Sequence, residues 1–172
     1  MRVVIVGAGP AGSSAAYFLA KAGADVTIVE RATFPRDKVC GDGLTPRSVW
    51  MLGRMGLAAL VDDKARAGAA AAHVSRAFLV SPAGHVLDAP LPPHIFGGRA
   101  AVVARAALDH ALVEHAVRAG AKLVDGAAVS TIERNDAGVR VVAADRAFDA
   151  DVVLGCDGAP SIVRKHLGAP DF

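Results

Sequence analysis

Three glycines and one glutamate near the N-terminus have the types and spacing of a dinucleotide-binding site. Gly7, Gly9 and Gly12 follow the apolar residues 3–6. In such a site the first glycine allows a tight turn, the second lets the backbone approach a pyrophosphate, and the third allows close helix packing. Glu30 ends the next apolar run, where an acid accepts hydrogen bonds from the ribose hydroxyls of an adenosine. The pattern predicts that this chain binds a dinucleotide.

The residues around these glycines predict a strand, a turn, a helix and a second strand. Residues 3–6 are apolar without polar alternation, which is typical of a parallel strand covered on both faces. Residues 13–22 favour a helix, and Gly23 is placed to end it. Residues 26–29 predict the second strand.

The start of the predicted helix completes the candidate phosphate site. Pro10 and Ala11 lie between the glycines, where the free amide groups of a helix N-terminus face phosphates. We therefore include both in the cofactor-binding stretch. Glu30 would repel a 2′-phosphate and so favours an unphosphorylated adenosine, although the neighbouring Arg31 weakens that inference.

Composition limits the class of protein. The 172 residues are enough for one domain with a proper core. The hydrophobic fraction of 53% with only 5% aromatics is typical of a globular α/β protein. Nineteen basic and 17 acidic residues are scattered without blocks, so we expect no nucleic-acid partner.

Targeting signals, disulfides and metals are not indicated. The N-terminus enters a strand at once, and no stretch of about 18 apolar residues occurs, so we expect a cytoplasmic protein. Cys40 and Cys156 do not suggest a disulfide framework, and the six histidines show no ligand spacing. We therefore predict no metal site.

The rest of the chain alternates between helical and extended patterns. Thr45 is a candidate N-cap with Pro46 at the first helical position, and Trp50 and Met51 are expected in the core. The predicted elements are a loop at 32–45, a helix at 46–60, a hairpin at 73–91 turning at 81–84, a helix at 104–119, a strand at 121–129, a hairpin of 130–133 with 139–143, and a strand from 151 leading to a helix from about 160.

The loop after Glu30 carries a second and more specific motif. Pro35, Lys38, Cys40, Gly41 and Gly43 fit the pattern PxxxKxCGxG. With the glycine fingerprint, this loop closely resembles the geranylgeranyl reductases, which belong with aromatic hydroxylases and flavin-dependent halogenases in one superfamily of FAD enzymes.

The resemblance implies a fold. It is a Rossmann-like α/β FAD/NAD(P)-binding domain of three layers, with a parallel central sheet and an antiparallel β hairpin. This domain would span residues 1–172, with about 73–103 as the start of an inserted substrate-domain sheet that is incomplete here.

The resemblance also implies further site residues. Arg36, Lys38 and the backbone of Cys40, Gly41, Asp42 and Gly43 would line the isoalloxazine side, and Arg105 would contact the flavin or its pyrophosphate. The Val129 backbone would lie against the adenine. Asp157 and Gly158 would join the flavin site as part of a GxDGxxSxxR pattern that is also associated with reduced nicotinamide. Cys40 is the candidate catalytic residue, through an influence on proton delivery.

The function implied is an FAD-dependent oxidoreductase that reduces carbon–carbon double bonds in an isoprenoid chain on a lipid or quinone, with NADPH or another donor. A substrate with a long prenyl chain implies transient membrane contact. The alternatives are a monooxygenase or halogenase acting on an aromatic substrate, and a non-catalytic flavin-binding module. The family's YxWxFP and GDAAG-like motifs do not occur, so we expect a truncated product, a fragment, or a split protein completed by a C-terminal half.

Overall fold

The computed structural model describes residues 1–40, 42–62 and 71–168. The chain forms two compact units. Met1–Arg36 together with Asp109–Phe172 make the first, here called the sheet unit, and Asp37–Leu108 make the second, the inserted unit. The second boundary lies within helix α4 (Arg105–Arg118).

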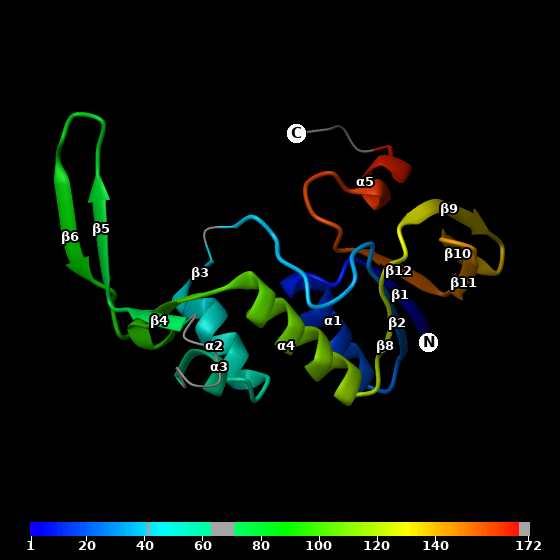
Figure 1. Ribbon diagram of the computed structural model, residues 1–172, viewed down its shortest axis with the longest axis horizontal. Coiled ribbons are helices and arrows are strands. Elements are labelled where there is room, and N and C mark those ends of the chain that lie inside the picture. Colours follow the sequence, from blue (N-terminus) through cyan, green and yellow to red (C-terminus); the bar gives the residue numbers. More distant parts are fainter. Residues whose placement is uncertain (41, 63–70, 169–172) are drawn as a thin grey trace. The chain divides into compact units, whose positions relative to one another are not determined.

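A parallel sheet forms the centre of the sheet unit (Figure 1). Its strand order is β12-β1-β2-β8, and every neighbouring pair is parallel. The elements are β1 (Arg2–Val6), β2 (Asp25–Val29), β8 (Lys122–Val124) and β12 (Val152–Gly155). Helix α1 (Pro10–Lys21) connects β1 to β2 and packs against both.

A second, antiparallel sheet covers one face of the parallel sheet. It has the order β11-β10-β9, from β9 (Val129–Asn135), β10 (Gly138–Ala143) and β11 (Arg146–Ala150). Val4 and Val29 share a buried cluster with Val141 of this sheet. Because side chains alternate along a strand, Val3 and Ile5 point to the opposite face, where α1 lies. The prediction of a three-layer α/β domain with a parallel central sheet is confirmed.

The N-terminal predictions hold. The first strand, the helix and the second strand occur as predicted, and Gly23 follows the helix with a φ of 85°. The predicted strand at 121–129 is shorter and stops at Val124. Strand β11 was not predicted, because it is held by pairing with β10 rather than by an apolar pattern of its own.

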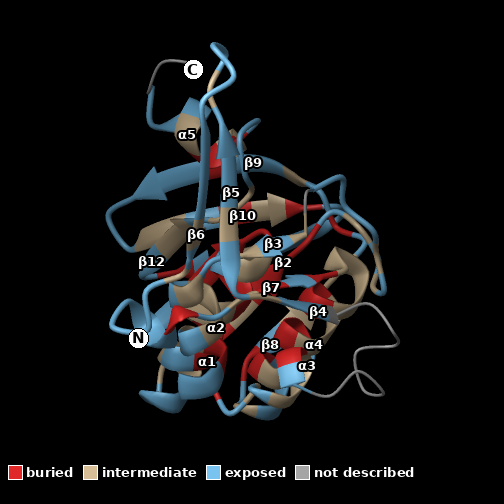
Figure 2. Ribbon diagram, turned by 90° about the vertical axis from the view of Figure 1, so that its left-hand side faces the viewer, coloured by how far each residue is buried: buried red, intermediate tan, exposed pale blue. Residues whose placement is uncertain are grey.

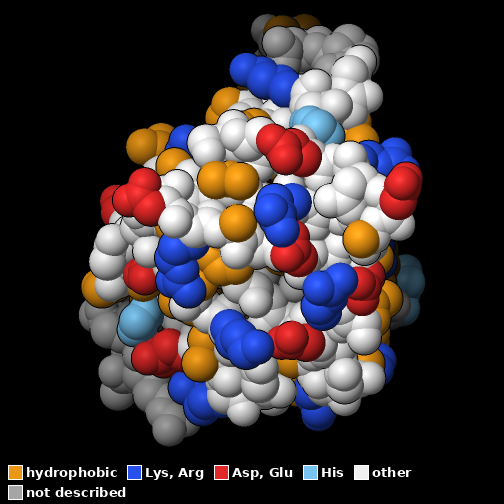
Figure 3. All heavy atoms as spheres, turned by 90° about the vertical axis from the view of Figure 1, so that its right-hand side faces the viewer, with side chains coloured by type: hydrophobic (Ala, Val, Ile, Leu, Met, Phe, Trp, Pro, Cys, Tyr) orange, Lys and Arg blue, Asp and Glu red, His pale blue; other side chains and the backbone are white. Residues whose placement is uncertain are grey.

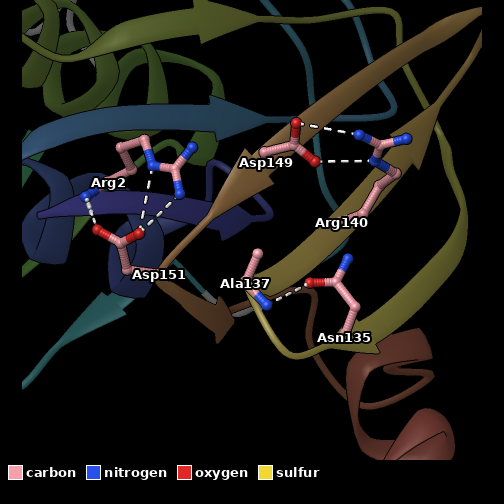
Figure 4. Close-up of polar contacts among 6 residues, drawn as sticks. All are labelled: Arg2, Asn135, Ala137, Arg140, Asp149 and Asp151. Atoms are coloured by element: carbon pink, nitrogen blue, oxygen red, sulfur yellow. Dashed lines mark hydrogen bonds and ion pairs between the residues drawn. The ribbon is translucent and has the colours of Figure 1, made fainter.

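The predicted hairpin of the antiparallel sheet is confirmed. At its turn, the Asn135 Oδ1 atom accepts a hydrogen bond from the Ala137 amide at 2.9 Å (Figure 4). This local bond replaces the strand pairing that the chain loses as it reverses. Helix α5 (Ile162–His166) follows β12, as the sequence predicts, with Ser161 as its N-cap.

Surface ion pairs link the strands of the sheet unit (Figure 4). Hydrogen bonds from the backbone amide and side chain of Arg2 lower the pKa of Asp151, and those from the Arg140 side chain lower the pKa of Asp149. The ionised carboxylates of Asp149 and Asp151 therefore stabilise the folded state above the pKa of an unfolded aspartate, about 3.9. This stabilisation is lost as the pH falls through the lower pKa that each carboxylate has in the folded state. Basic and acidic side chains also alternate over the face shown in Figure 3.

The inserted unit contains a small antiparallel sheet and a separate hairpin. The sheet has the order β3-β7-β4, from β3 (Gly43–Leu44), β4 (Ala71–Val74) and β7 (Ala100–Val103). The hairpin pairs β5 (Arg76–Val80) with β6 (Val86–Pro90), as predicted, and both strands are largely exposed (Figure 2). The helices are α2 (Pro46–Arg54), α3 (Ala59–Asp62) and the single turn η1 (Phe96–Gly98).

Two predictions in the inserted unit are wrong. The single helix at 46–60 is instead α2 and α3, because Gly56 adopts a φ of 79°, which a helix cannot continue through. Trp50 is not a core residue: it is 40% exposed and packs on Phe96 with ring centroids 5.4 Å apart. The predicted N-cap is confirmed, since Thr45 Oγ1 accepts from the Ser48 amide.

Two valines of the parallel sheet test where its stability resides. Val26 on β2 is fully buried, whereas Val152 on β12 is 38% exposed. We expect Val26→Ala to lower the free energy of unfolding by about 2 kcal/mol and Val152→Ala by less than about 1 kcal/mol, because only the first leaves a buried cavity. Urea unfolding followed by circular dichroism measures both, and equal losses would contradict the burial assigned to β2.

Candidate functional site

Helix α1 begins with backbone donors that are free to bind an anion. Gly9 is the N-cap, Pro10 occupies the first turn, and no side chain caps the helix. Its first turn contains no acidic residue. The amides of Ala11 and Gly12 have no acceptor within the helix, and the helix dipole adds positive potential there. This end of α1 therefore suits a phosphate group.

The glycines at positions 7 and 12 are required by close backbone contacts. A Cβ atom on Gly12 would lie 1.9 Å from the Gly7 carbonyl oxygen, so only glycine lets α1 approach β1 this closely. Gly7 has a φ of 99°, and a Cβ there would lie 2.5 Å from the carbonyl oxygen of Cys156 at the end of β12. These contacts bring the first glycine motif beside the Cys156–Asp157 turn.

Glu30 lies at the same end of the sheet as the start of α1. Its side chain is buried, and its Oε2 atom accepts a hydrogen bond from the Ala8 amide at 2.8 Å. The other oxygen, Oε1, accepts from the Ala32 amide at 3.0 Å. The Glu30 backbone amide donates to Val124 of β8 at 2.9 Å, and its carbonyl accepts from Ala127. Backbone contacts thus hold the carboxylate beside the helix N-terminus.

Arg36 lies beside Glu30. Its Nη2 atom is 3.6 Å from Glu30 Oε2. The resemblance predicts Arg36 on the isoalloxazine side, and this stays a prediction; in the structure Arg36 lies beside the carboxylate expected to bind the ribose. Arg31 is exposed, and no contact of its side chain links it to Glu30 among the described residues.

The turn after β12 is organised by Asp157. Its Oδ1 atom accepts from the Ser161 hydroxyl at 2.7 Å and its Oδ2 atom from the Ile162 amide at 2.6 Å. Asp157 thereby fixes the start of α5, while Gly158 has a φ of 83° and is exposed. Val129, at the start of β9, is partly buried and packs on the core.

The part of the second motif from Lys38 to Gly43 lies in the inserted unit, and Gly41 is outside the described residues. Cys40 and Lys38 are exposed, and Asp42 has a φ of 55°. The Asp42 carbonyl accepts from the Val103 amide at 2.9 Å, next to the pairing of β3 with β7 that begins at Gly43. This pairing holds the loop beside Arg105 at the start of α4.

The two cysteines have opposite electrostatic surroundings. A backbone hydrogen bond from Asp42, followed by a hydrogen bond from the Arg105 side chain, lowers the pKa of the Cys40 thiol. Burial, with the Asp157 carboxylate as a smaller cause, raises the pKa of the Cys156 thiol. Cys40 is therefore the cysteine whose thiolate forms at lower pH.

Two buried polar residues were missed by the sequence analysis. Ser13 is fully buried on α1, and its hydroxyl donates to the Ala8 carbonyl at 3.1 Å. Asp109 is fully buried on α4. The sequence could have indicated this, because Asp109 adjoins Leu108 and Leu112 on the apolar face of the predicted helix, where an unpaired charge is costly.

Comparison with known proteins identifies the ligand class. A family model described as FAD binding domain matches residues 1–172. The chain belongs to this FAD-binding family. The donors at α1 and the acceptor at Glu30 fit FAD, because FAD carries both a pyrophosphate and an adenosine ribose. Over residues 1–40, 42–62 and 71–168, no group of three His, Cys, Asp or Glu side chains is placed to hold a metal ion.

Relatives of this FAD-binding chain include reductases. It is 39% identical over 172 residues to a menaquinone reductase of Mycolicibacterium smegmatis, covering 96% of this chain and 39% of the relative. It is 33% identical over 171 residues to a geranylgeranyl diphosphate reductase of Rhodobacter capsulatus, covering 96% of this chain and 39% of that protein. These matches confirm the resemblance to geranylgeranyl reductases. The chain spans about two fifths of the length of these relatives.

The fold also matches solved flavoenzymes. The crystal structure of CmlS, described as a flavin-dependent halogenase, superposes with a TM-score of 0.83 at 27% identity, covering 97% of this chain and 31% of that one. The described part of the FAD-binding chain contains no helix with the length and apolar character needed to cross a membrane.

The contact between Gly12 and Gly7 can be tested with a matched glycine. Gly12→Ala would force α1 away from β1, so we expect loss of FAD binding and a loss of about 1–3 kcal/mol in unfolding free energy. Gly53 lies in α2, and a Cβ atom there would meet nothing within 4 Å, so Gly53→Ala should raise that free energy by about 0.5–1 kcal/mol. FAD fluorescence and thermal melting measure these effects. Retained FAD affinity in Gly12→Ala would contradict the site.

The cysteine pKa shifts predict selective alkylation. Because the Cys40 pKa is lowered and the Cys156 pKa is raised, iodoacetamide should modify Cys40 at a lower pH than Cys156. Arg105→Gln should move the Cys40 profile to higher pH, whereas Arg118→Gln at the other end of α4 should not. Peptide mass spectrometry over a pH series measures both profiles, and an unmoved Cys40 profile in Arg105→Gln would refute the assignment.

Proposed function

We propose that the chain acts in an FAD-dependent oxidoreductase of the geranylgeranyl reductase type, which reduces carbon–carbon double bonds in the isoprenoid chain of a quinone or lipid. The geometry that supports this is the buried Glu30 carboxylate, 2.8 Å from the Ala8 amide in the turn between β1 and α1. The reductive reaction and the isoprenoid class are supported by the similarity to proteins named menaquinone reductase and geranylgeranyl diphosphate reductase.

The residues of the sheet unit bind and orient the cofactor in this proposal. FAD, when bound, supplies the hydride chemistry that saturates the double bond. The amides of Ala11 and Gly12 hold its pyrophosphate, and Glu30 accepts hydrogen bonds from its ribose. We assign the Val129 backbone to the adenine, and Asp157 and Gly158 to the flavin side.

The loop of the inserted unit contributes charge and a proton. Lys38 and the backbone of Asp42 and Gly43 are assigned to the isoalloxazine side, where positive charge and backbone amides favour a ring that gains negative charge. Saturation of a double bond requires a proton as well as a hydride. We assign the proton to Cys40 Sγ, which is exposed and regains it from solvent.

The electron donor and the substrate region complete the proposal. NADPH is the proposed donor. The hairpin of β5 and β6 is proposed as the start of the substrate sheet, because Phe78, Leu79 and Leu87 on it are 66%, 60% and 55% exposed. Exposed apolar side chains of this kind suit contact with an isoprenoid chain. Transient contact with a membrane that holds such substrates is part of the same proposal.

A second candidate function is supported by the likeness to CmlS, described as a flavin-dependent halogenase. In that case the same FAD site would serve oxygen-dependent attack on an aromatic substrate. A non-catalytic flavin-binding module is the third candidate. The products distinguish the three.

The test is a product assay on the FAD-loaded chain. With NADPH, menaquinone bearing an isoprenoid chain and no oxygen, we expect a product whose isoprenoid fragment is heavier by two hydrogens in tandem mass spectrometry, which separates chain saturation from reduction of the quinone ring. Cys40→Ser should slow its formation about a hundredfold, as the loss of a general acid does. Cys156→Ser, a change in the half-buried cysteine, should leave the rate unchanged.

Other results assign the other functions. An oxygenated or halogenated aromatic product, formed only in air, would favour the second candidate. Bound FAD without any product would favour the flavin-binding module. A folded chain that binds no FAD would contradict all three.

A further inference from the structure

Asp109 is a buried carboxylate on α4 with no role in the proposed function. Its side chain is 0% exposed, and its neighbours on the helix, Leu108, Leu112 and Val113, belong to the apolar core. A carboxylate in such surroundings needs a cationic partner. The Nη1 atom of Arg36 lies 2.9 Å from Asp109 Oδ2 and is that partner.

Arg36 is shared unequally between two carboxylates. Its Nη1 atom is within hydrogen-bond distance of Asp109, whereas its Nη2 atom is 3.6 Å from Glu30 Oε2, which is too far for a hydrogen bond. The guanidinium also lies over the Phe34 ring, 5.1 Å from its centroid. Arg36 therefore attracts the Glu30 carboxylate electrostatically while it donates a hydrogen bond to Asp109.

This unequal sharing keeps Glu30 available to a ligand. A carboxylate has about four acceptor positions. The amides of Ala8 and Ala32 occupy one on each oxygen of Glu30, and the ribose hydroxyls need the others. A direct hydrogen bond from Arg36 would occupy one of those positions and turn the carboxylate away from the ribose hydroxyls. The Arg36 Nε atom is itself buried with no hydrogen-bond partner among the described residues.

We propose that Asp109 is a positioning residue for ribose recognition. It holds Arg36 at ion-pair distance from Glu30, and this leaves the Glu30 oxygens directed at the ribose hydroxyls. The inference rests on the proposed binding of FAD through Glu30. It assigns to α4, which is remote in sequence from the glycine motif, a role in selecting a nucleotide with a free 2′-hydroxyl.

The test compares ADP with 2′-deoxy-ADP as competitors of FAD, followed by flavin fluorescence. We expect the wild-type chain to prefer ADP by about tenfold or more, as a hydrogen bond to a charged group implies. Asp109→Asn should reduce this preference to less than about threefold, because Arg36 then closes on Glu30. Glu114→Gln, which changes a half-exposed carboxylate on the same helix, should keep the wild-type preference.

A loss of structure would weaken both nucleotides equally, so the ratio of their affinities isolates the positioning role. Should Asp109→Asn fail to fold, Arg36→Lys replaces it, since a lysine cannot reproduce the two-sided contact. An unchanged ratio in whichever variant is folded overturns this inference and leaves the proposed function standing. A wild-type chain that binds neither FAD nor ADP overturns both.

Discussion

The close approach of helix α1 to strand β1 is the constraint on which the rest of the sheet unit depends. It requires the Gly7 carbonyl to occupy the space that a Cβ on Gly12 would fill. This contact sets the direction of α1 and the position of its free amides. It also places the Ala8 amide where it donates to the Glu30 carboxylate. Backbone geometry, more than any side chain, therefore places the proposed phosphate and ribose sites at one end of the sheet.

The Glu30 carboxylate joins segments that are far apart in sequence. It accepts a hydrogen bond from the turn after β1. The Glu30 backbone hydrogen-bonds to the end of β8 and to Ala127 beyond it, and Arg36 connects the carboxylate to Asp109 on α4. A carboxylate buried in this way is costly unless amides and a cation compensate it. The compensation fixes the Glu30 carboxylate, which we propose binds the adenosine ribose, before a ligand binds. Such preorganisation reduces the cost of ordering the site on binding.

Family membership and substrate class rest on different kinds of evidence. Membership of the FAD-binding family rests on the family match over residues 1–172 and on a fold shared with solved flavoenzymes. The proposed reductase type rests on the loop at Pro35 to Gly43 and on the similarity to relatives that are named reductases. A fold of this kind supports several chemistries, so the loop and the product assay, rather than the fold, must decide between them.

Local patterns in the sequence determined most of the sheet unit. The glycine spacing, the apolar runs before and after it and the turn at Asn135 each specify a short segment, because turn geometry and strand burial depend on nearby residues. Only the tertiary structure decided what depends on distant segments. The exposure of Trp50 and the strand β11 follow from packing and pairing. The same holds for the pairing of Asp109 with Arg36, since a helix pattern shows that a charge adjoins an apolar face but not which cation meets it.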